Sequence, residues 1–260
     1  MSSDYTIDEL MATFISRQMH DDELVIVGAN QPIPRAGVMQ AYLLRCPNLK
    51  VPMYFYMTDM AREKQLQLYP LFADGRYRRW AEGYFTFEMQ LESARKADVC
   101  FIGGIQVDQY GNTNLIGIKG KEGNFKLRGP GSAGTPTTSS YIKRYYILMG
   151  SHNPRVFVKR CDYVSAVGWH NGGADARRAL GLPGGGPKYV ISPFGIMDFE
   201  EETKKMRLKA VYPGVDPDQV VRNTGFELIM HEQVEVVSPP NEDELRVLRG
   251  RVDPQGILRK

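Results

Sequence analysis

Short apolar runs recur along the chain and alternate with segments of helical spacing. The run ELVIVGAN at 23–30 is followed by others at 53–57, 98–104, 155–160 and 188–195. Brief apolar runs bounded by glycine or charged residues are typical of strands buried on both faces of a parallel sheet. Each run is therefore expected to be a buried strand.

Helical segments separate these strands. Thr6 and Glu9 have the S/T-x-x-E spacing of a capping box, and the apolar positions after them predict a first helix from about Thr6 to Met19. Helical spacing returns at 36–46 and at 87–97. Strand, helix and strand in alternation predict an α/β class, with an open, mostly parallel sheet and flanking helices.

The C-terminal part adds two further elements. Residues 206–214 alternate apolar and polar positions, as a half-exposed strand does, and residues 239–250 predict a helix that starts at prolines and has acids in its first turn. A chain of 260 residues is long enough for one large α/β domain, and we expect a single domain over 1–260.

Charge argues against a nucleic-acid partner. Charged residues make up 24% of the chain, the net charge is +3, and Lys and Arg are interspersed with Asp and Glu. Nucleic-acid binding usually needs a concentrated basic face. The N-terminus has no apolar run of signal-peptide length and no later run reaches a membrane-spanning length, so a cytoplasmic protein with no membrane partner is expected.

The cysteines and histidines form no metal-binding pattern. Cys46, Cys100 and Cys161 lie far apart without a CxxC or Cys/His spacing, which favours buried thiols of a reducing compartment. The four histidines share no spacing with a Cys or an acidic pair that would indicate a metal site or a triad. We expect no metal.

The best candidate for chemistry is the stretch RGPGSAGTPTTSSY at 128–141. Gly129, Gly131 and Gly134 can adopt backbone angles closed to other residues, so successive N–H groups can point into one concavity. Thr135 suits an N-cap and Pro136 a first helical turn.

Two interpretations of this glycine loop stay open. It is not a Walker A loop, because no Lys-Ser/Thr pair follows the last glycine, and it is not a GxGxxG turn. It is either an anion or oxyanion cradle to which Arg128 adds a full positive charge, or a glycine turn that passes tightly over the sheet.

Two other loops are weaker candidates. GGIQVDQYGNTN at 103–114 groups Gln106, Asp108, Asn112 and Asn114, a composition that favours a turn satisfied by its own side chains. LGLPGGGPKYVIS at 180–192 has three consecutive glycines, which indicate a flexible connection or a close backbone approach.

At these same loops the sequence resembles the β-type subunits of family I coenzyme A transferases, of the glutaconate CoA-transferase kind, and their relatives that open steroid-derived rings on CoA thioesters. The resemblance runs from about residue 20 to about residue 250. It is carried by ARKADVCFIGGIQVDQYGNTNL, RGPGSAGTPTTSS, RVFVKRCDYVSAVGW and GGGPKYVISPFGIMDF with the later MRLKAVYPGV.

The resemblance implies the sheet fold of CoA transferases and sugar-phosphate isomerases, and a site completed by a separately encoded α-type subunit in a heterodimer or heterotetramer. It places the glycine loop beside the acyl thioester, with coenzyme A as part of the substrate and no other cofactor. The residues it marks for substrate or CoA binding are Gly129, Gly131, Ser132, Gly134, Gln106 and Asn112.

One departure bears on the reaction. Classical members of the family carry a glutamate nucleophile in a Glu-Ser-Gly or Ser-Glu-Asn-Gly stretch, whereas this chain reads CPNLKVPMYFYMTDMAREKQ at 46–65. Without that carboxylate no glutamyl-CoA thioester forms there. Asp59, in a Thr-Asp similar to that of the ring-opening relatives, is expected to orient water or substrate, or to cap a helix.

The resemblance and this departure favour a β-type subunit acting on an acyl-CoA by C–C hydrolysis or decarboxylation, with Arg128 and Asp59 as its catalytic candidates. The alternatives are a true CoA transferase, whose glutamate would be Glu63 or Glu82, and a non-catalytic subunit that completes the partner's site. Aromatic residues expected either to line a bulky acyl pocket or to form core are Tyr54, Phe55, Tyr56, Trp80, Tyr84 and Phe85.

Overall fold

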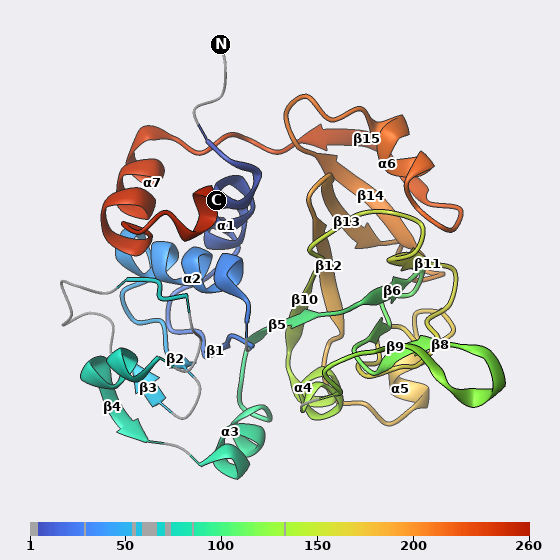
Figure 1. Ribbon diagram of the computed structural model, residues 1–260, viewed down its shortest axis with the longest axis horizontal. Coiled ribbons are helices and arrows are strands. Elements are labelled where there is room, and N and C mark those ends of the chain that lie inside the picture. Colours follow the sequence, from blue (N-terminus) through green and yellow to red (C-terminus); the bar gives the residue numbers. More distant parts are fainter. Residues whose placement is uncertain are drawn as a thin grey trace. The chain divides into compact units, whose positions relative to one another are not determined.

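The computed structural model describes residues 5–28, 30–53, 56–58, 67–70, 74–84, 86–132 and 134–260 (Figure 1). The chain divides into two compact units, unit 1 with Met1–Val99 and Pro239–Lys260, and unit 2 with Cys100–Ser238. Unit 2 is continuous in sequence, whereas unit 1 is assembled from both ends of the chain. The expectation of a single domain over 1–260 is not tested by this division and stays a prediction.

Unit 1 combines helices with short strands. Its helices are α1 (Ile7–Arg17), α2 (Pro32–Leu44), α3 (Phe87–Ser93) and α7 (Glu242–Val247), with 3-10 or π turns at Gly75–Trp80, Leu248–Val252 and Ile257–Arg259. Its strands are β1 (Val25–Ile26), β2 (Val51–Met53), β3 (Tyr56–Thr58) and β4 (Ala81–Tyr84). The last three form a small antiparallel sheet.

The predicted capping box of α1 is confirmed. The Thr6 side chain accepts from the Glu9 N–H at 3.2 Å, and the Glu9 carboxylate accepts from the Thr6 N–H at 2.9 Å. A second box caps α7, where Asn241 and Glu244 exchange the same two bonds. The predicted C-terminal helix therefore begins after Asn241 and not at the prolines, because the Asn241 side chain accepts from the Glu244 N–H and caps the helix there.

Two buried carboxylates join the ends of the chain within unit 1. Glu9 accepts from Arg249 at 2.8 and 2.9 Å, and Glu244 accepts from Arg17 at 2.9 and 2.6 Å. Burial alone would raise the pKa of Glu9, but the hydrogen bonds from Arg249 and from the Thr6 N–H hold it below its ordinary value. The C-terminal segment is thus an integral part of the N-terminal fold.

Two predicted strands of unit 1 differ in extent from the sequence pattern. Of the run at 23–30 only Val25–Ile26 is a strand, because the Gly28 N–H bonds to the Gln31 side chain at 3.2 Å instead of to a neighbouring strand. The run at 53–57 is wrong as a single buried strand: Met53 and Tyr56 belong to two antiparallel strands and pair with each other. An apolar run has no internal signal for such a reversal.

Unit 2 carries most of the strands. They are β5 (Val99–Gly103), β6 (Gln106–Asp108), β7 (Thr113–Asn114), β8 (Gly117–Lys119), β9 (Phe125–Arg128), β10 (Arg144–Leu148), β11 (Phe157–Val158), β12 (Pro187–Ser192), β13 (Gly195–Phe199), β14 (Met206–Val211) and β15 (Ile229–Val236). The helices are α4 (Thr135–Tyr141), α5 (Ala176–Ala179) and α6 (Pro217–Arg222).

The main sheet has seven strands in the order β1-β5-β10-β12-β13-β14-β15. The pairs β10/β12 and β14/β15 are parallel, whereas β13 pairs antiparallel with β12 and with β14. The predicted α/β class, an open sheet with flanking helices, is confirmed (Figure 1). Tyr145 and Tyr146 of β10 are fully buried, and the Tyr146 ring stacks on Phe101 of β5 at 5.4 Å.

The run at 155–160 lies outside the main sheet. Only Phe157 and Val158 form a strand, β11, which pairs in parallel with Val107 and Asp108 of β6 in a separate three-stranded sheet, β11-β6-β7. Charged residues on both sides limit the apolar stretch to a length that cannot cross a large sheet. This small sheet sets the register between residues 106–108 and the segment after residue 158.

The glycines at 184–186 make a close backbone approach and do not form a flexible connection. The Gly184 N–H donates to Ser140 O at 2.8 Å, and a Cβ on Gly185 would lie 2.1 Å from Lys143 O. Only glycine fits at such a distance. The loop therefore packs against the C-terminal end of α4.

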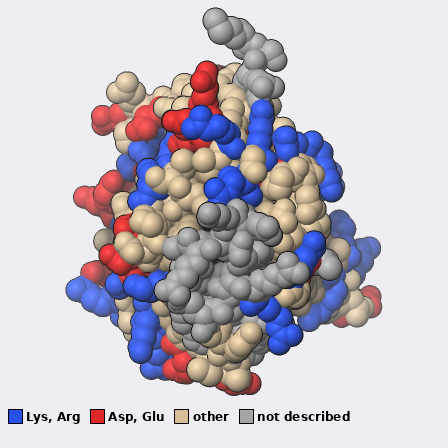
Figure 2. Space-filling view, turned by 90° about the vertical axis from the view of Figure 1, so that its left-hand side faces the viewer, with Lys and Arg blue, Asp and Glu red and all other residues tan. Residues whose placement is uncertain are grey.

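The charged residues and the cysteines lie where the composition and spacing predict. Figure 2 shows basic and acidic side chains both spread over the visible face of the described residues. Cys46, Cys100 and Cys161 are free and buried, as predicted, and burial raises the pKa of the Cys100 thiol to about 12. In the described part of the chain, no helix has the length and apolar character needed to cross a membrane.

Candidate functional site

The glycine loop at 129–134 follows the exposed hairpin β8–β9 and leads into α4. The Gly129 N–H donates to Ile116 O at 2.9 Å, and the Gly131 N–H donates to Leu115 O at 3.0 Å. These two N–H groups therefore hold the loop against residues 115–116. Of the three glycine N–H groups expected to face a ligand, those of Gly129 and Gly131 are thus used inside the protein. Among the described residues, the Gly134 N–H has no such acceptor.

The glycines are required for different reasons. A Cβ on Gly129 would lie 2.2 Å from Leu115 O, so this position needs glycine for close approach. Gly131 and Gly134 have φ angles of +97° and +84°, in the region that favours glycine, and a Cβ on Gly131 would meet no atom within 4 Å. The tight-turn interpretation thus explains the glycine at 129. At Gly131 the space next to the backbone is open.

The end of the loop offers donors. Within the described chain, no acceptor is bonded to the N–H groups of Ser132 and Gly134, and both residues are partly exposed. The predicted N-cap at Thr135 is displaced by one residue, because Gly134 is the N-cap and has no side chain to bond. The Thr135 hydroxyl instead donates to Ser132 O at 2.6 Å, with Ser165 O also within 3.0 Å.

Arg128 lies beside the loop, and its guanidinium is hydrogen-bonded to the protein backbone there. Its Nη1 group donates to Ile116 O and, at 3.3 Å, to Gly129 O, and its guanidinium lies 5.1 Å from the Phe125 ring centre. The side chain is exposed. One edge of the guanidinium is thus directed at backbone oxygens of the loop, and its role toward a substrate stays a prediction.

Arg177 anchors the helix that follows the loop. From α5 its buried guanidinium donates to Ser139 O at 2.5 Å, Val167 O at 2.9 Å, Gly168 O at 3.1 Å and Gly184 O at 2.9 Å. Four carbonyl oxygens from three segments therefore share one cation, and burial lowers the pKa of this arginine. The sequence pattern did not predict this residue, since nothing local marks Arg177 as buried.

Gln106 and Asn112 are bonded within the protein. Gln106 Oε1 accepts from Asn114 Nδ2 at 2.7 Å and from the Asp162 N–H at 3.0 Å. Asn112 Nδ2 donates to both Asp108 oxygens and to His170 O, and its Oδ1 accepts from Gly168 N–H. Both residues are almost completely buried. These contacts match the structural interpretation of the loop at 103–114, and substrate binding by either residue stays a prediction.

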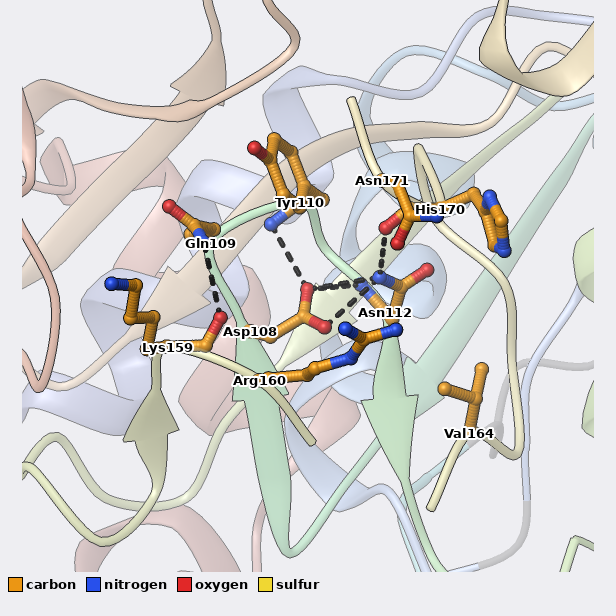
Figure 3. A pocket seen from close by; sticks show the side chains of 9 residues that line it. All are labelled: Asp108, Gln109, Tyr110, Asn112, Lys159, Arg160, Val164, His170 and Asn171. Carbon is orange, nitrogen blue, oxygen red and sulfur yellow. Dashed lines mark hydrogen bonds between the residues drawn. The ribbon is translucent and has the colours of Figure 1, made fainter. Parts of the chain in front are cut away.

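A pocket of about 330 Å³ opens directly above this loop (Figure 3). Its floor is formed by Asp108 and Asn112, and its walls by Gln109, Tyr110 and Val164. Lys159, Arg160, His170 and Asn171 complete the lining. We call this cavity the Asp108 pocket. All of it lies within unit 2.

Asp108 is the charged centre of the floor. One carboxylate oxygen accepts from the Tyr110 N–H at 2.9 Å and the Asn112 N–H at 3.1 Å, and Asn112 Nδ2 contacts both oxygens. Burial raises the pKa of this carboxyl above its ordinary value, although the hydrogen bonds from Asn112 and Tyr110 oppose the shift. Gly111, at φ +70°, closes the turn.

Two adjacent cations lie over this floor. Lys159 and Arg160 follow β11 and are exposed, and in Figure 3 the Arg160 guanidinium is directed toward the Asn112 side of the pocket. In the part of the chain that the structure describes, neither side chain forms an ion pair or a hydrogen bond. The sequence analysis did not single them out, because the strand before them has only two residues. A Lys-Arg pair directly after a short apolar strand is the feature that could have indicated this site.

Several candidates fall outside what the structure describes. Asp59, Glu63, Tyr54, Phe55 and Phe85 are not among the described residues, and Tyr56, Trp80 and Glu82 are described only in their backbone. Tyr84 is 64% exposed, with the Arg78 guanidinium 5.8 Å from its ring centre. The expected aromatic pocket thus stays a prediction.

A buried histidine was not singled out by the sequence. His152 has Nδ1 2.8 Å from Ser192 Oγ and Nε2 3.0 Å from Thr224 Oγ1, and its ring stacks on Phe157 at 3.7 Å. Burial lowers its pKa to about 4. Since both ring nitrogens are occupied and the ring is 6% exposed, His152 has a structural role.

The chain is thus an α/β protein whose glycine loop and cationic pocket both lie in unit 2. The family model described as Coenzyme A transferase matches residues 75–223. The B subunit of glutaconate CoA-transferase from Acidaminococcus fermentans is 33% identical over 97% of this chain and 94% of its own length. The B subunit of 3-oxoadipate CoA-transferase from Pseudomonas knackmussii is 31% identical over 95% and 93%. The chain belongs to the coenzyme A transferase family and is a β-type subunit.

The solved structures agree with this assignment. The crystal structure of glutaconate coenzyme A-transferase from A. fermentans superposes with a TM-score of 0.86, at 28% identity, over 99% of this chain and 98% of that one. The decarboxylase AibA/AibB has the same fold, with a TM-score of 0.82 at 21% identity over 98% of this chain and 97% of that one. The cholesterol ring-cleaving hydrolase IpdB subunit of Rhodococcus jostii is 30% identical over 68% of each chain.

Proposed function

We propose that this chain is the β-type half of a heteromeric enzyme that breaks a C–C bond of an acyl-CoA, by hydrolysis or decarboxylation, and does not exchange CoA between acids. The observation that carries the proposal is the sequence at 46–65, which lacks the Glu-Ser-Gly or Ser-Glu-Asn-Gly element of the transferases. Full-length similarity to transferase subunits with no nucleophile at that place favours another reaction on the same class of thioester.

The hydrolysis needs no covalent enzyme intermediate. A base takes a proton from water, and the hydroxyl oxygen adds to a ring ketone β to the thioester. The C–C bond to the α carbon then breaks, its electron pair passes to the thioester enolate, and a proton quenches the α carbon. Two oxyanions must be stabilised, and hydrogen-bond donors aimed at them contribute most of such a rate enhancement.

This chain has donors suited to that task. The N–H groups of Ser132 and Gly134 lack acceptors within the described residues, and Arg128 brings a cation to the same loop. Asp59, in the sequence Met-Thr-Asp-Met, is the candidate on this chain for orienting water or substrate. The acid or base that this chain lacks is expected from the α-type partner subunit, and coenzyme A enters as part of the substrate with no further cofactor.

The partner belongs to the proposal because the relatives are named as parts of heteromeric enzymes. The glutaconate and 3-oxoadipate CoA-transferase relatives are both B subunits, and AibA/AibB carries two components in its name. We expect this chain to form a heterodimer or heterotetramer with an α-type subunit. A cytoplasmic location, with the cysteines reduced, is part of the same proposal.

A true CoA transferase is the second candidate. Its support is the identity of 33% and 31% to two transferase relatives over almost the whole chain, against 68% coverage for the hydrolase relative. The nucleophile would then be Glu63 or Glu82. A third candidate, a non-catalytic subunit that completes the partner's site, predicts that Arg128→Ala leaves turnover intact in the assembled complex.

One trapping experiment separates the first two. The chain co-expressed with its α-type partner is incubated with a cyclic 3-oxoacyl-CoA, and separately with acetyl-CoA and a dicarboxylate, then treated with borohydride or hydroxylamine. The proposal predicts no modified glutamate by mass spectrometry and, for the hydrolytic reaction, incorporation of ¹⁸O from labelled water into a new carboxylate. Reduction of a glutamate on this chain, together with CoA transfer, would establish the transferase instead.

A further inference from the structure

We propose that the Asp108 pocket is an anion subsite that holds a second charged group of the acyl-CoA, a phosphate of coenzyme A or a distal carboxylate of the acyl chain. The inference rests on the proposed function, because it assumes an acyl-CoA substrate. It assigns a ligand chemistry to a cavity outside the glycine loop. The pocket's volume of about 330 Å³ is sufficient for a phosphate or a carboxylate with its adjoining carbons.

The cations of the pocket are available to a ligand. Lys159 and Arg160 both line it and are exposed, and neither has a charged or hydrogen-bonding partner among the described residues. An arginine fork matches the geometry of phosphate or carboxylate oxygens, and the lysine adds a point charge. Gln109 Nε2 donates to Lys159 O at 3.2 Å, which fixes the backbone from which both cations extend.

The carboxylate in the floor does not compete for these cations. No ion pair joins Asp108 to Arg160 or Lys159 in the described part of the chain. Its oxygens accept from the Tyr110 N–H, the Asn112 N–H and Asn112 Nδ2, and it is 3% exposed (Figure 3). Asp108 therefore anchors the loop that forms the floor, and the open part of the pocket keeps a net positive charge.

The pocket is connected to the glycine loop through one residue. Val164 lines the pocket, and the next residue, Ser165, accepts on its Oγ from the Leu115 N–H at 3.0 Å. The Ser165 carbonyl lies 3.0 Å from the Thr135 hydroxyl, and Leu115 O accepts from the Gly131 N–H. A thioester at the glycine loop and an anion in the pocket would thus be held by a single hydrogen-bonded framework.

Direct binding to the full-length chain tests the subsite. The dissociation constants of CoA, pantetheine, glutaryl-pantetheine and butyryl-pantetheine are measured by calorimetry for the wild type and for K159A/R160A. If the anion is a phosphate, the double variant weakens CoA binding by about tenfold and leaves the three phosphate-free probes unchanged. If it is a carboxylate, the variant weakens glutaryl-pantetheine by a similar factor and leaves butyryl-pantetheine unchanged.

Two further variants control for charge and structure. Arg178→Ala removes an exposed cation of α5 that is outside the pocket, and it should bind every probe as the wild type does. Arg160→Lys, which keeps both positive charges, should bind the affected probe more tightly than K159A/R160A and nearly as tightly as the wild type. The inference is overturned if K159A/R160A binds all four probes normally, if it loses all four equally, or if the wild type binds none.

The outcome for the subsite and the outcome for the proposed function can be distinguished. If the complex with the α-type partner turns over a cyclic 3-oxoacyl-CoA while K159A/R160A has wild-type affinities and KM, the subsite is wrong and the proposed function stands. If no acyl-CoA is turned over by the complex although the double variant weakens CoA binding selectively, the subsite stands and the proposed function is wrong.

Discussion

The amide of Asn112 contacts both oxygens of the Asp108 carboxylate, at 3.1 and 2.9 Å, and so closes the loop that underlies the pocket. Because the carboxylate is buried, removal of the amide leaves it without its main side-chain partner. We expect Asn112→Ala to lower the free energy of unfolding by about 3 kcal/mol. Urea unfolding followed by circular dichroism measures the loss.

Gln109→Ala is the matched control for Asn112. Gln109 is partly exposed and makes one hydrogen bond to Lys159 O, so its loss should cost about 1 kcal/mol or less. A direct substrate contact by Asn112 would instead weaken binding without a change in unfolding midpoint. Equal midpoints for the two variants would contradict the structural role.

The two glycines at the start of the glycine loop should respond differently to alanine. Gly129→Ala places a methyl group 2.2 Å from Leu115 O and must displace the loop, so we expect loss of activity by more than about tenfold and a loss of stability of about 2 kcal/mol. Gly131→Ala meets no atom within 4 Å and has only its φ of +97° to accommodate, at about 1 kcal/mol.

Activity of the assembled enzyme and the unfolding midpoint are both read for each glycine variant. If Gly131 faces the thioester, its alanine variant should lose turnover out of proportion to its small loss of stability. A Gly129→Ala protein with wild-type stability and turnover would show that the loop does not approach Leu115 in solution.

His152 should make the protein less stable in mild acid. Its pKa is lowered by burial to about 4 in the folded chain, against about 6.5 when unfolded, so the folded state binds fewer protons and stability falls as pH drops from about 6.5 toward 4. Between about pH 7.5 and about pH 5 the loss is on the order of 2 kcal/mol. Chemical unfolding at both pH values measures it.

The comparison with His152→Gln isolates this histidine from other titrating groups. The variant should be less stable at neutral pH, because the ring leaves its stack with Phe157, but its stability should fall less on acidification. An unchanged pH dependence in His152→Gln would mean that another group causes the acid sensitivity.

Arg177 should tolerate neither loss nor shortening. It donates to four carbonyl oxygens, so Arg177→Lys leaves several of them buried without a donor and is expected to cost about 3 kcal/mol. Arg178→Lys, one position along on the exposed face, should cost less than about 0.5 kcal/mol. Similar unfolding midpoints for the two variants would contradict the anchoring role.

The elements that the sequence predicts well are those with strong local signals. The capping box of Thr6 and Glu9 fixes the start of α1, and the continuous apolar run at 98–104 becomes β5. The antiparallel pair of Met53 and Tyr56 could not be predicted in this way, because one apolar run covers both strands. Local pattern determines which residues are buried, but not where a run reverses.

The site shows the same division. The glycine loop is recognisable from spacing, but the bonds that occupy the Gly129 and Gly131 N–H groups come from residues 115–116. The Lys159 and Arg160 pair reaches the Asp108 pocket only because β11 pairs with β6, a contact between segments about fifty positions apart. Long-range register of this kind leaves no periodic trace in a single sequence.

The ion pair of Glu9 with Arg249 also orders events during synthesis. The two residues are 240 positions apart, so α1 has emerged from the ribosome long before its partner is made. Unit 2, continuous from Cys100 to Ser238, can fold while the chain is still growing, whereas unit 1 waits for its last segment. Helix α1 is thus translated long before it can form its final set of bonds.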